Sequence, residues 1–573
     1  MKLAIINHEK CKPAICSNEC KKYCPVEKKE TDSCIVIQNK AKIDENTCIG
    51  CSICIKRCPF GAINVINLPS VNENDIVHRY GENGFALYGL PAPKKKGTLG
   101  LLGRNGIGKS TAIKLLCGQE KINLGSKKAS PEEIKKFFKG NEILRYLTDI
   151  EKKKISYKPQ NLSSLAIDVN VTKLLEKRGS SEEIKKLAEE LGITHILKNK
   201  MNKLSGGELQ GVAILATTLG ESDIYFFDEP LAYLDIRERL RVSDFIRKIG
   251  NKKEVIVVEH DLLLIDYLTD SLNIFYGAAG AYGAISGVKT GKYGVNSYLQ
   301  GFLKEENMRI RDKALNFNFT KNLGSKGNSI ASWPEFSIKF DSGFELKVDS
   351  GEIHQNHVIG ILGKNGTGKT SFVRALAGEL KTNKGKLDLD LEISYKPQYL
   401  FTEDKNLVRE VLFKEKVTKK MKSTFNLGIL EGKRLCDLSG GEFQRFSVAV
   451  CLSKDADIYL IDEPSAYLDV EERISVAKAI KEIMTEREKT AFVVDHDLLL
   501  VSYLANSVIN FNGEGGSFGH AGKVKSFEDG ISELLKSLDI TLRKDEESGR
   551  PRINKKGSVL DREQKERGEW VVL

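Results

Sequence analysis

The chain repeats itself, and this repeat limits the folds that it can adopt. Five blocks of sequence occur twice, in the same order, within its 573 residues. The paired blocks are LGLLGRNGIGKST (99–111) with IGILGKNGTGKTS (359–371), ISYKPQ at 155–160 and at 393–398, LSGGELQ (204–210) with LSGGEFQ (438–444), FFDEPLAYLD (226–235) with LIDEPSAYLD (460–469), and VVEHDLLL (257–264) with VVDHDLLL (493–500). Blocks repeated in one order indicate two homologous domains.

The two copies differ in length at one place. Gln160 follows Lys109 by 51 positions, whereas Gln398 follows Lys369 by 29. The first copy therefore carries an insertion at about 121–150. A Ser-Pro pair followed by acids, and then a glycine and a second amphipathic run, predict a helix–turn–helix-like hairpin there. Such a hairpin is either a tolerated surface insertion or a docking element.

Each copy contains a phosphate-binding loop. GRNGIGKS (103–110) and GKNGTGKT (363–370) fit the pattern G-x-x-x-x-G-K-[ST], and each follows an apolar, strand-like run. The glycines let backbone N–H groups face phosphate oxygens, and the N-terminus of the following helix favours negative charge. We expect Lys109 and Lys369 to reach the β- and γ-phosphates, and the next hydroxyl residue to bind Mg²⁺.

A second apolar strand in each copy ends in an acidic pair, Asp228-Glu229 and Asp462-Glu463. This is the pattern of a Walker B strand. The aspartate is expected to hold Mg²⁺, generally through water, and the glutamate to polarise the attacking water. The two copies therefore predict two sites for ATP hydrolysis.

The first 58 residues contain nine of the 12 cysteines, and MKLAIINHEKCK lacks the apolar core of a secretory signal. This combination favours metal binding over disulfides. Cys48, Cys51, Cys54 and Cys58-Pro59 have the spacing of a bacterial ferredoxin run, in which the fourth cysteine ligates the other cluster. A looser run of four cysteines ends in Cys24-Pro25.

Applying the crossover rule to both runs predicts two [4Fe–4S] clusters. One would be held by Cys11, Cys16, Cys20 and Cys58, and the other by Cys24, Cys48, Cys51 and Cys54. Zinc is the rival metal for such an array, but a zinc site does not need the x2-x2-x3-Pro spacing. Cys34 is left over and is expected to pack in the core.

The overall composition adds two expectations. The net charge of +11 fits a polyanionic partner such as RNA without requiring one. The longest apolar runs fall well short of a membrane span, which needs about 18 residues or more. We therefore expect a soluble, cytoplasmic protein with no membrane partner.

The LSGGE signature that follows each phosphate loop identifies a resemblance to the ATP-binding-cassette superfamily. The resemblance implies two α/β nucleotide-binding domains arranged head to tail, as a monomer with an internal pseudo-dimer. Each ATP would lie between the phosphate loop of one domain and the signature of the other. The first composite site would contain Gly103, Asn105, Gly106, Gly108, Lys109, Ser110, Thr111, Gln160, Asp228, Glu229 and His260 with Ser439, Gly440 and Gly441. The second would contain Gly363, Asn365, Gly366, Gly368, Lys369, Thr370, Ser371, Gln398, Asp462, Glu463 and His496 with Ser205, Gly206 and Gly207.

Within these sites the resemblance assigns roles. Glu229, Glu463, His260 and His496 would be catalytic, with the histidines as γ-phosphate sensors. Mg²⁺ would be bound by Ser110, Gln160 and Asp228 in one site and by Thr370, Gln398 and Asp462 in the other. Aromatic residues before each loop are candidates for adenine stacking, although each is equally compatible with the core: Tyr80, Phe85, Phe340 and Phe344.

The whole chain resembles the ABC subfamily E, or RNase L inhibitor, family of ribosome-recycling ATPases. The segments that carry the resemblance are NHEKCKP (7–13), CIGCSICIKRCPFGAI (48–63), NLPS (67–70), HRYGENGF (78–85) and GRPRINKKGSVLDREQKE (549–566). It implies that ATP-driven closure moves the cluster domain against the small ribosomal subunit and its rRNA. The partner would be a release factor or its Pelota-type relative.

The resemblance also gives a domain map. It comprises an α+β ferredoxin-like iron–sulfur domain (1–70), nucleotide-binding domain 1 (71–295), a first hinge or linker (296–325), nucleotide-binding domain 2 (326–535) and a second hinge or linker (536–573). Four arginines in the linker segments are candidates for contact with rRNA phosphates: Arg309, Arg311, Arg550 and Arg552.

The chain departs from the family pattern at Gly211, where the second copy has Arg445 and the family usually has arginine. A glycine early in a helix costs about 0.5–1 kcal/mol, and it is expected to weaken signalling from that signature.

Three other function classes share some of these motifs. A transporter ATPase gives no role to the ferredoxin run. A DNA machine of the SMC or Rad50 type needs long heptads between its Walker motifs, for which 51 residues leave no room. An ATP-gated electron-transfer protein would use both the cassettes and the clusters, and it is the alternative that stays open.

Overall fold

The computed structural model describes residues 2–6, 10–29, 33–44, 47–49, 51–67, 75–125, 129–311, 314–315, 327–398 and 403–572. The quoted segments at 7–9 and 68–70, and linker residues 312–313 and 316–325, lie outside these ranges. No helix within the described ranges has both the length and the apolar character needed to cross a membrane.

The first cassette is built on one mixed sheet with strand order β5-β6-β12-β11-β7-β10-β9-β8, and β13 pairs with β11. Its strands are β5 (Ile76–Arg79), β6 (Ala86–Tyr88), β7 (Gly97–Leu102), β8 (Ile155–Lys158), β9 (Ile224–Asp228), β10 (Glu254–Val258), β11 (Ser271–Ala278), β12 (Tyr282–Ile285) and β13 (Lys289–Thr290). The five strands from β11 to β8 are parallel. Parallel strands are covered on both faces, which explains why their sequences are continuously apolar.

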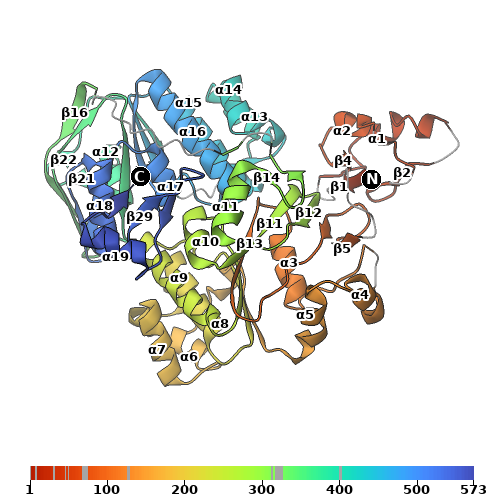
Figure 1. Ribbon diagram of the computed structural model, residues 1–573. Helices are drawn as coiled ribbons and strands as arrows, with labels where there is room; N and C mark the ends of the chain where they lie inside the picture. The colour runs from red at the N-terminus through yellow and green to blue at the C-terminus, as the bar shows by residue number, and fades with distance from the viewer. Residues whose placement is uncertain are drawn as a thin grey trace.

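Helices cover both faces of this sheet (Figure 1). They are α3 (Lys109–Leu116), α4 (Pro131–Phe137), α5 (Ile143–Asp149), α6 (Val171–Leu175), α7 (Ser181–Leu191), α8 (Gly206–Thr218), α9 (Ile236–Gly250), α10 (Leu262–Leu268) and α11 (Gly291–Gln300). The insertion contains α4 and α5. Ser130 caps α4 through a capping box with Glu133, as its Ser-Pro-acid sequence favours.

The second cassette has the same sheet order, β17-β18-β27-β26-β20-β25-β24-β23, with β28 beside β26. Its strands are β17 (Phe336–Lys339), β18 (Glu345–Val348), β20 (Val358–Gly363), β23 (Ile393–Lys396), β24 (Ile458–Asp462), β25 (Thr490–Val494), β26 (Ser507–Glu514), β27 (Phe518–Ala521) and β28 (Lys525–Ser526). Its helices are α12 (Lys369–Leu376), α13 (Val408–Lys414), α14 (Lys419–Thr424), α15 (Gly440–Ser453), α16 (Val470–Arg487), α17 (Leu498–Leu504) and α18 (Phe527–Leu538). The matching order confirms that the sequence repeat is a repeat of structure.

Short two-stranded sheets complete the two cassettes. They are β14 (Phe302–Leu303) with β15 (Met308–Arg309), β16 (Ser329–Trp333) with β19 (Gly351–His354), and β21 (Lys381–Thr382) with β22 (Gly385–Lys386). The β21–β22 hairpin occupies the part of the second copy that corresponds to the α4–α5 insertion in the first.

The cysteine-rich segment folds into a small α+β module at the edge of the first cassette (Figure 1). Strands β1 (Lys2–Ile6) and β4 (Ile63–Asn67) pair antiparallel, as do β2 (Ile35–Ile37) and β3 (Ala41–Ile43). Helices α1 (Glu19–Lys22) and α2 (Ile53–Arg57) complete it. Its core includes six buried cysteines, so the core itself is a place for metal.

One residue of the first cassette anchors this module. Asn83 is buried and has a left-handed backbone, with φ of 55°. Its backbone carbonyl accepts a hydrogen bond from Ile6 N at 2.8 Å, and its side chain exchanges two hydrogen bonds with the backbone of Ile43, both at 2.9 Å. The neighbouring Glu82 pairs with Lys42 at 2.7 Å.

The C-terminal segment is folded and docked on the first cassette. Strands β29 (Leu542–Lys544), β30 (Pro551–Ile553) and β31 (Val571–Val572) form a sheet, and α19 (Val559–Glu566) lies between β30 and β31 along the chain. Arg550 is fully buried, and its Nη2 donates to Oδ2 of Asp266 in α10 at 2.7 Å. Arg552 binds the same carboxylate at 2.6 Å.

These contacts correct the expectation for the linker arginines. Arg550 and Arg552 are held by Asp266, and Arg311 donates to Glu471 of α16 at 2.7 Å. Only Arg309 of the four is exposed in the described part of the chain. A charged sequence was misleading here because the acids that pair with it lie far away in the chain.

Candidate ATP sites and cysteine-lined cavities

Both phosphate loops have the backbone that their glycines permit. Gly106 and Gly108 have φ of 71° and 94°, and α3 begins at Lys109. A side chain at Gly108 would collide with the ring of Phe85, whose Cζ lies 2.6 Å from the position of a Cβ. The loop in the second cassette repeats this conformation.

The loop lysines are buried and point back into their own loops. Nζ of Lys109 donates to the carbonyls of Gly103 at 2.8 Å and Arg104 at 2.6 Å. Lys369 makes the equivalent bonds at 3.0 and 2.7 Å. Burial lowers the pKa of both lysines to about 8, against the raising effect of nearby carboxylates. A bound phosphate would place further negative charge next to these buried ammonium groups and so favour their charged form.

The first loop opens into a cleft of about 880 Å³. Its lining contains most of the residues expected for the first site: Tyr80, Phe85, Asn105, Gly106, Gly108, Lys109, Ser110, Thr111, Gln160, Glu229 and His260. Sequence reasoning missed Ile107, Val258 and Gly280 in this lining. Gly280 belongs to none of the repeated blocks, and its N–H donates to the carbonyl of Gly106 at 2.8 Å.

The aromatic candidates separate into two positions. Phe85 and Phe344 lie directly beneath the loop glycines Gly108 and Gly368. Tyr80 lines the cleft, is 41% exposed, and donates its hydroxyl to Glu120 at 2.5 Å. Phe85 and Phe344 thus pack against the loops, while Tyr80 presents its ring to the cleft.

The first Walker B glutamate is held toward the cleft. Glu229 has a left-handed backbone with φ of 49°. Its Oε1 accepts a hydrogen bond from Nε2 of Gln160 at 2.8 Å and lies 3.3 Å from Nε2 of His260. Burial opposes ionisation of this carboxyl, but His260, Lys109 and Gln160 outweigh burial and lower its pKa to about 2. Burial lowers the pKa of His260, with a further contribution from Lys109.

The second glutamate has the same backbone conformation, but its surroundings shift its pKa in the opposite direction. Glu463 also has φ of 49° and accepts from Gln398 at 2.7 Å. His496 lies farther away, at 3.8 Å. Burial and the charge of Asp462 raise the pKa of Glu463.

The Walker B aspartates offer oxygens that suit a cation. Among the described residues, neither carboxylate oxygen of Asp228 has a hydrogen-bond partner, and Oδ1 of Asp462 has none either. Oδ2 of Asp462 accepts from the hydroxyl of Thr370 at 2.8 Å. Burial raises the pKa of both aspartates. Buried, unpaired carboxylate oxygens next to a hydroxyl group fit a magnesium ion, which prefers oxygen ligands.

The two cassettes meet head to tail through their phosphate loops. The N–H of Asn105 donates to Oδ2 of Asp469 at 3.0 Å, and the N–H of Asn365 donates to Oδ2 of Asp235 at 2.9 Å. Each loop therefore binds the residue that ends the DEPxAYLD block of the opposite cassette.

The signature motifs lie at the N-termini of two helices. Ser205 and Ser439 cap α8 and α15 through capping boxes. Tyr233 packs next to Gly206 of its own signature, and its carbonyl accepts from the side chain of Asn365 at 3.2 Å. Among the described residues that line the first cleft, none comes from the signature of the second cassette.

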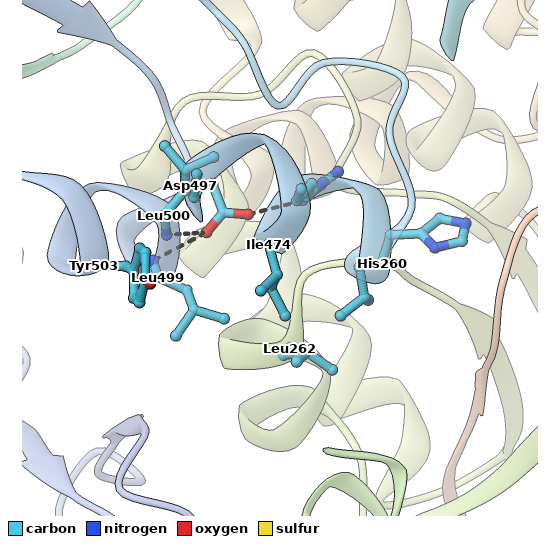
Figure 2. Close-up of a pocket in the computed structure, with 10 residues that line it drawn as sticks. His260, Leu262, Ile474, Asp497, Leu499, Leu500 and Tyr503 are labelled. Carbon is cyan, nitrogen blue, oxygen red and sulfur yellow. Dashed lines mark hydrogen bonds and ion pairs between the residues drawn. The ribbon is translucent and has the colours of Figure 1, made fainter. Parts of the chain in front are cut away.

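A second, largely apolar cavity lies between the cassettes beside the first cleft. Its lining combines His260 and Leu262 of the first cassette with Ile474, Leu499 and Tyr503 of the second, and Figure 2 shows the ring of His260 directed away from the other side chains. Asp497, which caps α17, also lines it and is paired with Arg473 at 3.0 Å. His260 thus borders both the ATP cleft and the cassette interface.

In the N-terminal module, the cysteines line two separate cavities. One is lined by Cys11, Cys16, Cys20 and Cys58, and the other by Cys24, Cys48, Cys51 and Cys54. These are the two sets that the crossover rule gives. The extra cysteine, Cys34, is buried and borders the second cavity.

One buried thiol in each set has a raised pKa. Burial raises the pKa of Cys20 to about 11, with contributions from the other three members of its set. Cys54 behaves in the same way within the second set. Thiols with such pKa values stay protonated at neutral pH unless a cation compensates for their charge, and iron would do so. Among the described residues, no three His, Cys, Asp or Glu side chains are grouped closely enough to hold a single metal ion.

Comparison with known proteins identifies the same cassettes and the same cysteine-rich module. The family model "ABC transporter" covers residues 93–232 and 346–466. A "4Fe-4S binding domain" model covers 41–64, and "Possible Fer4-like domain in RNase L inhibitor, RLI" covers 1–29. The translation initiation factor RLI1 of Saccharomyces cerevisiae is 41% identical over 599 residues, with 100% of this chain and 98% of the yeast protein covered.

The chain belongs to the RNase L inhibitor, or ABC subfamily E, family. Two solved structures of family members are similar. A model of ribosome-bound archaeal Pelota and ABCE1 contains a chain that is 42% identical, with a TM-score of 0.93 and coverage of 100% of this chain and 99% of that one. The archaeal ribosome recycling factor aABCE1, crystallised with the ribosomal stalk protein aP1, is 40% identical, with a TM-score of 0.83 and coverage of 88% and 100%.

Membership of the family establishes the broad chemistry. Two ABC domains make the chain an ATPase, and the N-terminal models are those of 4Fe–4S binding. Its full-length relatives include proteins named as translation initiation factors.

Proposed function

We propose that this protein splits ribosomes into subunits after termination or rescue, using ATP-driven closure of its two cassettes to move the iron–sulfur module. The observation that carries the proposal is the full-length similarity to an ABCE1 chain in a ribosome-bound assembly with Pelota. The partners would be the small ribosomal subunit and its rRNA, the ribosomal stalk, and a Pelota-type or release factor.

Each composite site would bind one ATP between a phosphate loop and the opposite signature, namely Ser439, Gly440 and Gly441 for the first and Ser205, Gly206 and Gly207 for the second. The loop lysines would bind the β- and γ-phosphates. Glu229 and Glu463 would polarise the attacking water, and His260 and His496 would contact the γ-phosphate. The short distance between Asn105 and Asp469 supports a shared site, because closure brings the opposite cassette onto the loop.

Magnesium would be held by a hydroxyl, a glutamine and an aspartate in each site. These are Ser110, Gln160 and Asp228 in the first, and Thr370, Gln398 and Asp462 in the second. When bound, the ion neutralises charge on the β- and γ-phosphates. The unpaired oxygens of Asp228 support this assignment.

Two [4Fe–4S] clusters would be held by the two cysteine sets. When bound, they crosslink a module that is too small to gain much stability from its own apolar core. The module would then be a rigid body, which is what a mechanical role requires.

One short loop would link ATP to the module. Tyr80 and Phe85 line the cleft, and Asn83, between them, carries the hydrogen bonds to Ile6 and Ile43 of the module. A change at the adenine end of the cleft would therefore be transmitted directly to the module. The domain map would follow from this arrangement, with 1–70 moving against 71–295, and with 296–325 and 536–573 as the hinges of 326–535.

The second candidate function is ATP-gated electron transfer, and the two cysteine-lined cavities favour it. One experiment separates the two. Protein prepared anaerobically is mixed with 70S- or 80S-type ribosomes and ATP, and subunits are counted on a sucrose gradient. We expect ATP-dependent release of subunits, and none with the Glu229→Gln/Glu463→Gln variant. Reduction of an added acceptor on ATP hydrolysis, with ribosomes left intact, would favour electron transfer instead.

A further inference from the structure

Each cassette buries a lysine to which the ATP-site motifs assign no role. Lys158 at the end of β8 and Lys396 at the end of β23 are 0% and 1% exposed. Both belong to the repeated ISYKPQ block. Burying an ammonium group costs several kcal/mol unless hydrogen bonds and opposite charges compensate for it. A buried lysine that occurs at the same place in both copies therefore needs an explanation in its contacts.

In the first cassette, the ammonium group binds the backbone of the Walker B turn. Nζ of Lys158 donates to the carbonyl of Asp228 at 2.9 Å and to the carbonyl of Glu229 at 3.1 Å. Strands β8 and β9 are parallel neighbours, with Lys158 opposite Phe227, so the side chain extends just past the end of the sheet. It reaches the backbone where the chain leaves the strand.

This turn is strained. Glu229 has φ of 49°, a left-handed conformation that is unfavourable for a residue with a side chain. Its carbonyl also accepts a hydrogen bond from Nε2 of Gln210 at 2.6 Å, and Gln210 is fully buried in α8. Two buried donors, one from a strand and one from a helix, therefore hold one carbonyl oxygen.

The second cassette repeats the arrangement. Glu463 has φ of 49°. Lys396 donates to its carbonyl at 3.4 Å and to that of Asp462 at 2.6 Å. Gln444 donates to the carbonyl of Glu463 at 2.5 Å. The same three hydrogen bonds therefore surround the same strained residue in both cassettes, which indicates that they have a role in the site.

We propose that Lys158 and Lys396 are positioning residues for ATP hydrolysis, which hold each Walker B glutamate in the left-handed conformation that directs its carboxylate toward the nucleotide. The inference rests on the proposed roles of Glu229 and Glu463. It differs from the role of the phosphate-loop lysines, because Lys158 and Lys396 bind the backbone of the protein and would not contact ATP.

The test separates ATP binding from turnover. Methionine has a similar length to lysine but neither charge nor donor. We expect the Lys158→Met/Lys396→Met variant to lose at least tenfold in kcat, while its Kd for a fluorescent ATP analogue stays within about twofold of the parent. Lys109→Met/Lys369→Met should instead lose binding of the analogue.

A lysine just before β8 provides a control variant. Lys153 pairs with Glu254, at the start of β10, at 2.7 Å. Lys153→Met should keep kcat within about twofold. If the double methionine variant does not fold, Gln210→Leu/Gln444→Leu removes the other donor to the same carbonyls and should give the same loss of kcat without loss of binding.

Unchanged kcat in the methionine variant, or equal losses of kcat and of ATP affinity, would overturn the proposal. The Glu229→Gln/Glu463→Gln variant is assayed in parallel. If it still hydrolyses ATP, the roles proposed for the glutamates are wrong. If it does not, while the methionine variant turns over normally, only the positioning role of the lysines is wrong. Neither assay involves ribosomes.

Discussion

The two cassettes share one sheet order and one site layout, yet they differ in what surrounds their Walker B glutamates. Glu229 lies 3.3 Å from His260 and its pKa is lowered to about 2. Glu463 lies 3.8 Å from His496 and its pKa is raised. The duplicated core thus fixes where each carboxylate sits, while small shifts in its neighbours set how readily it ionises.

The cassettes also differ in what is attached to them. The first cassette anchors the iron–sulfur module through Asn83, carries the α4–α5 insertion, and receives the C-terminal segment on Asp266. In the second cassette, the position of Asp266 is occupied by Ser502. The difference suggests a division of labour, in which the first cassette is the platform for the moving parts and the second closes against it.

The largest expected effect concerns the glutamates themselves. The Glu229→Gln/Glu463→Gln variant should lose at least ~100-fold in kcat, because removal of a general base usually costs 10²–10⁴. Of the single variants, Glu463→Gln should lose the larger share, because a carboxylate with a raised pKa is the stronger general base. Steady-state phosphate release measures this. Equal losses in the two single variants would mean that the difference between the sites has no kinetic consequence.

The next largest effect is expected when the contact between the C-terminal segment and the first cassette is removed. Asp266→Ser, which copies the second cassette, leaves Arg550 buried without its partner and should cost about 3–5 kcal/mol. Urea unfolding and limited proteolysis of the C-terminal segment report the loss. Ser502→Ala is the matched control and should change stability little. A stable Asp266→Ser variant would show that Arg550 is satisfied without this carboxylate.

The two cysteine cavities allow a comparison within the module. Cys16→Ser and Cys54→Ser each remove one proposed ligand, one from each set. Each variant should lose about half of the roughly eight iron atoms that two [4Fe–4S] clusters contain. Iron analysis and the visible absorption spectrum of anaerobic protein measure this. Zinc in place of iron in the parent protein would contradict the cluster assignment.

The smallest effect is expected at the signature helices. Arg445 pairs with Glu472 in the second cassette. In the first, Gly211 takes its place, and a Cβ there would lie 3.0 Å from Cγ2 of Ile193. Gly211→Ala should therefore change the free energy of unfolding by less than about 0.5 kcal/mol, because the crowding offsets the usual gain from replacing a helical glycine.

We expect another arginine of the first cassette to compensate in part for this glycine. Arg241 lowers the pKa of Glu238, although burial and Asp235 raise it overall to about 6. The residue that matches Arg241 in the second copy is Ser475. Arg241→Ser should consequently destabilise the protein more than Gly211→Ala does. The reverse order, measured by thermal unfolding, would mean that Arg241 does not replace the missing arginine.

Much of this architecture could be predicted because it is encoded locally. Repeated blocks indicate two cassettes. The ferredoxin spacing predicts that Cys48, Cys51 and Cys54 line one cavity with Cys24, and that Cys58 lines the other. Glycines in the phosphate loops require the backbone that the structure has.

The rest depends on contacts between distant parts of the chain. Arg550 looked like a surface charge because its partner, Asp266, lies 284 positions earlier. Asn83 reads as an ordinary turn residue until the module is placed against it. The two glutamate–histidine distances differ by 0.5 Å although the flanking sequence blocks are nearly the same, so the local sequence does not predict the difference.

The central claim is that ATP moves a metal-crosslinked module to separate ribosomal subunits. The most direct test follows light scattering of 70S- or 80S-type ribosomes after ATP is added to the parent protein and to the Cys16→Ser/Cys54→Ser variant. We predict that the parent lowers the scattering as subunits separate, and that the variant hydrolyses ATP but leaves ribosomes intact. Splitting at the parent's rate by protein without clusters would contradict the account.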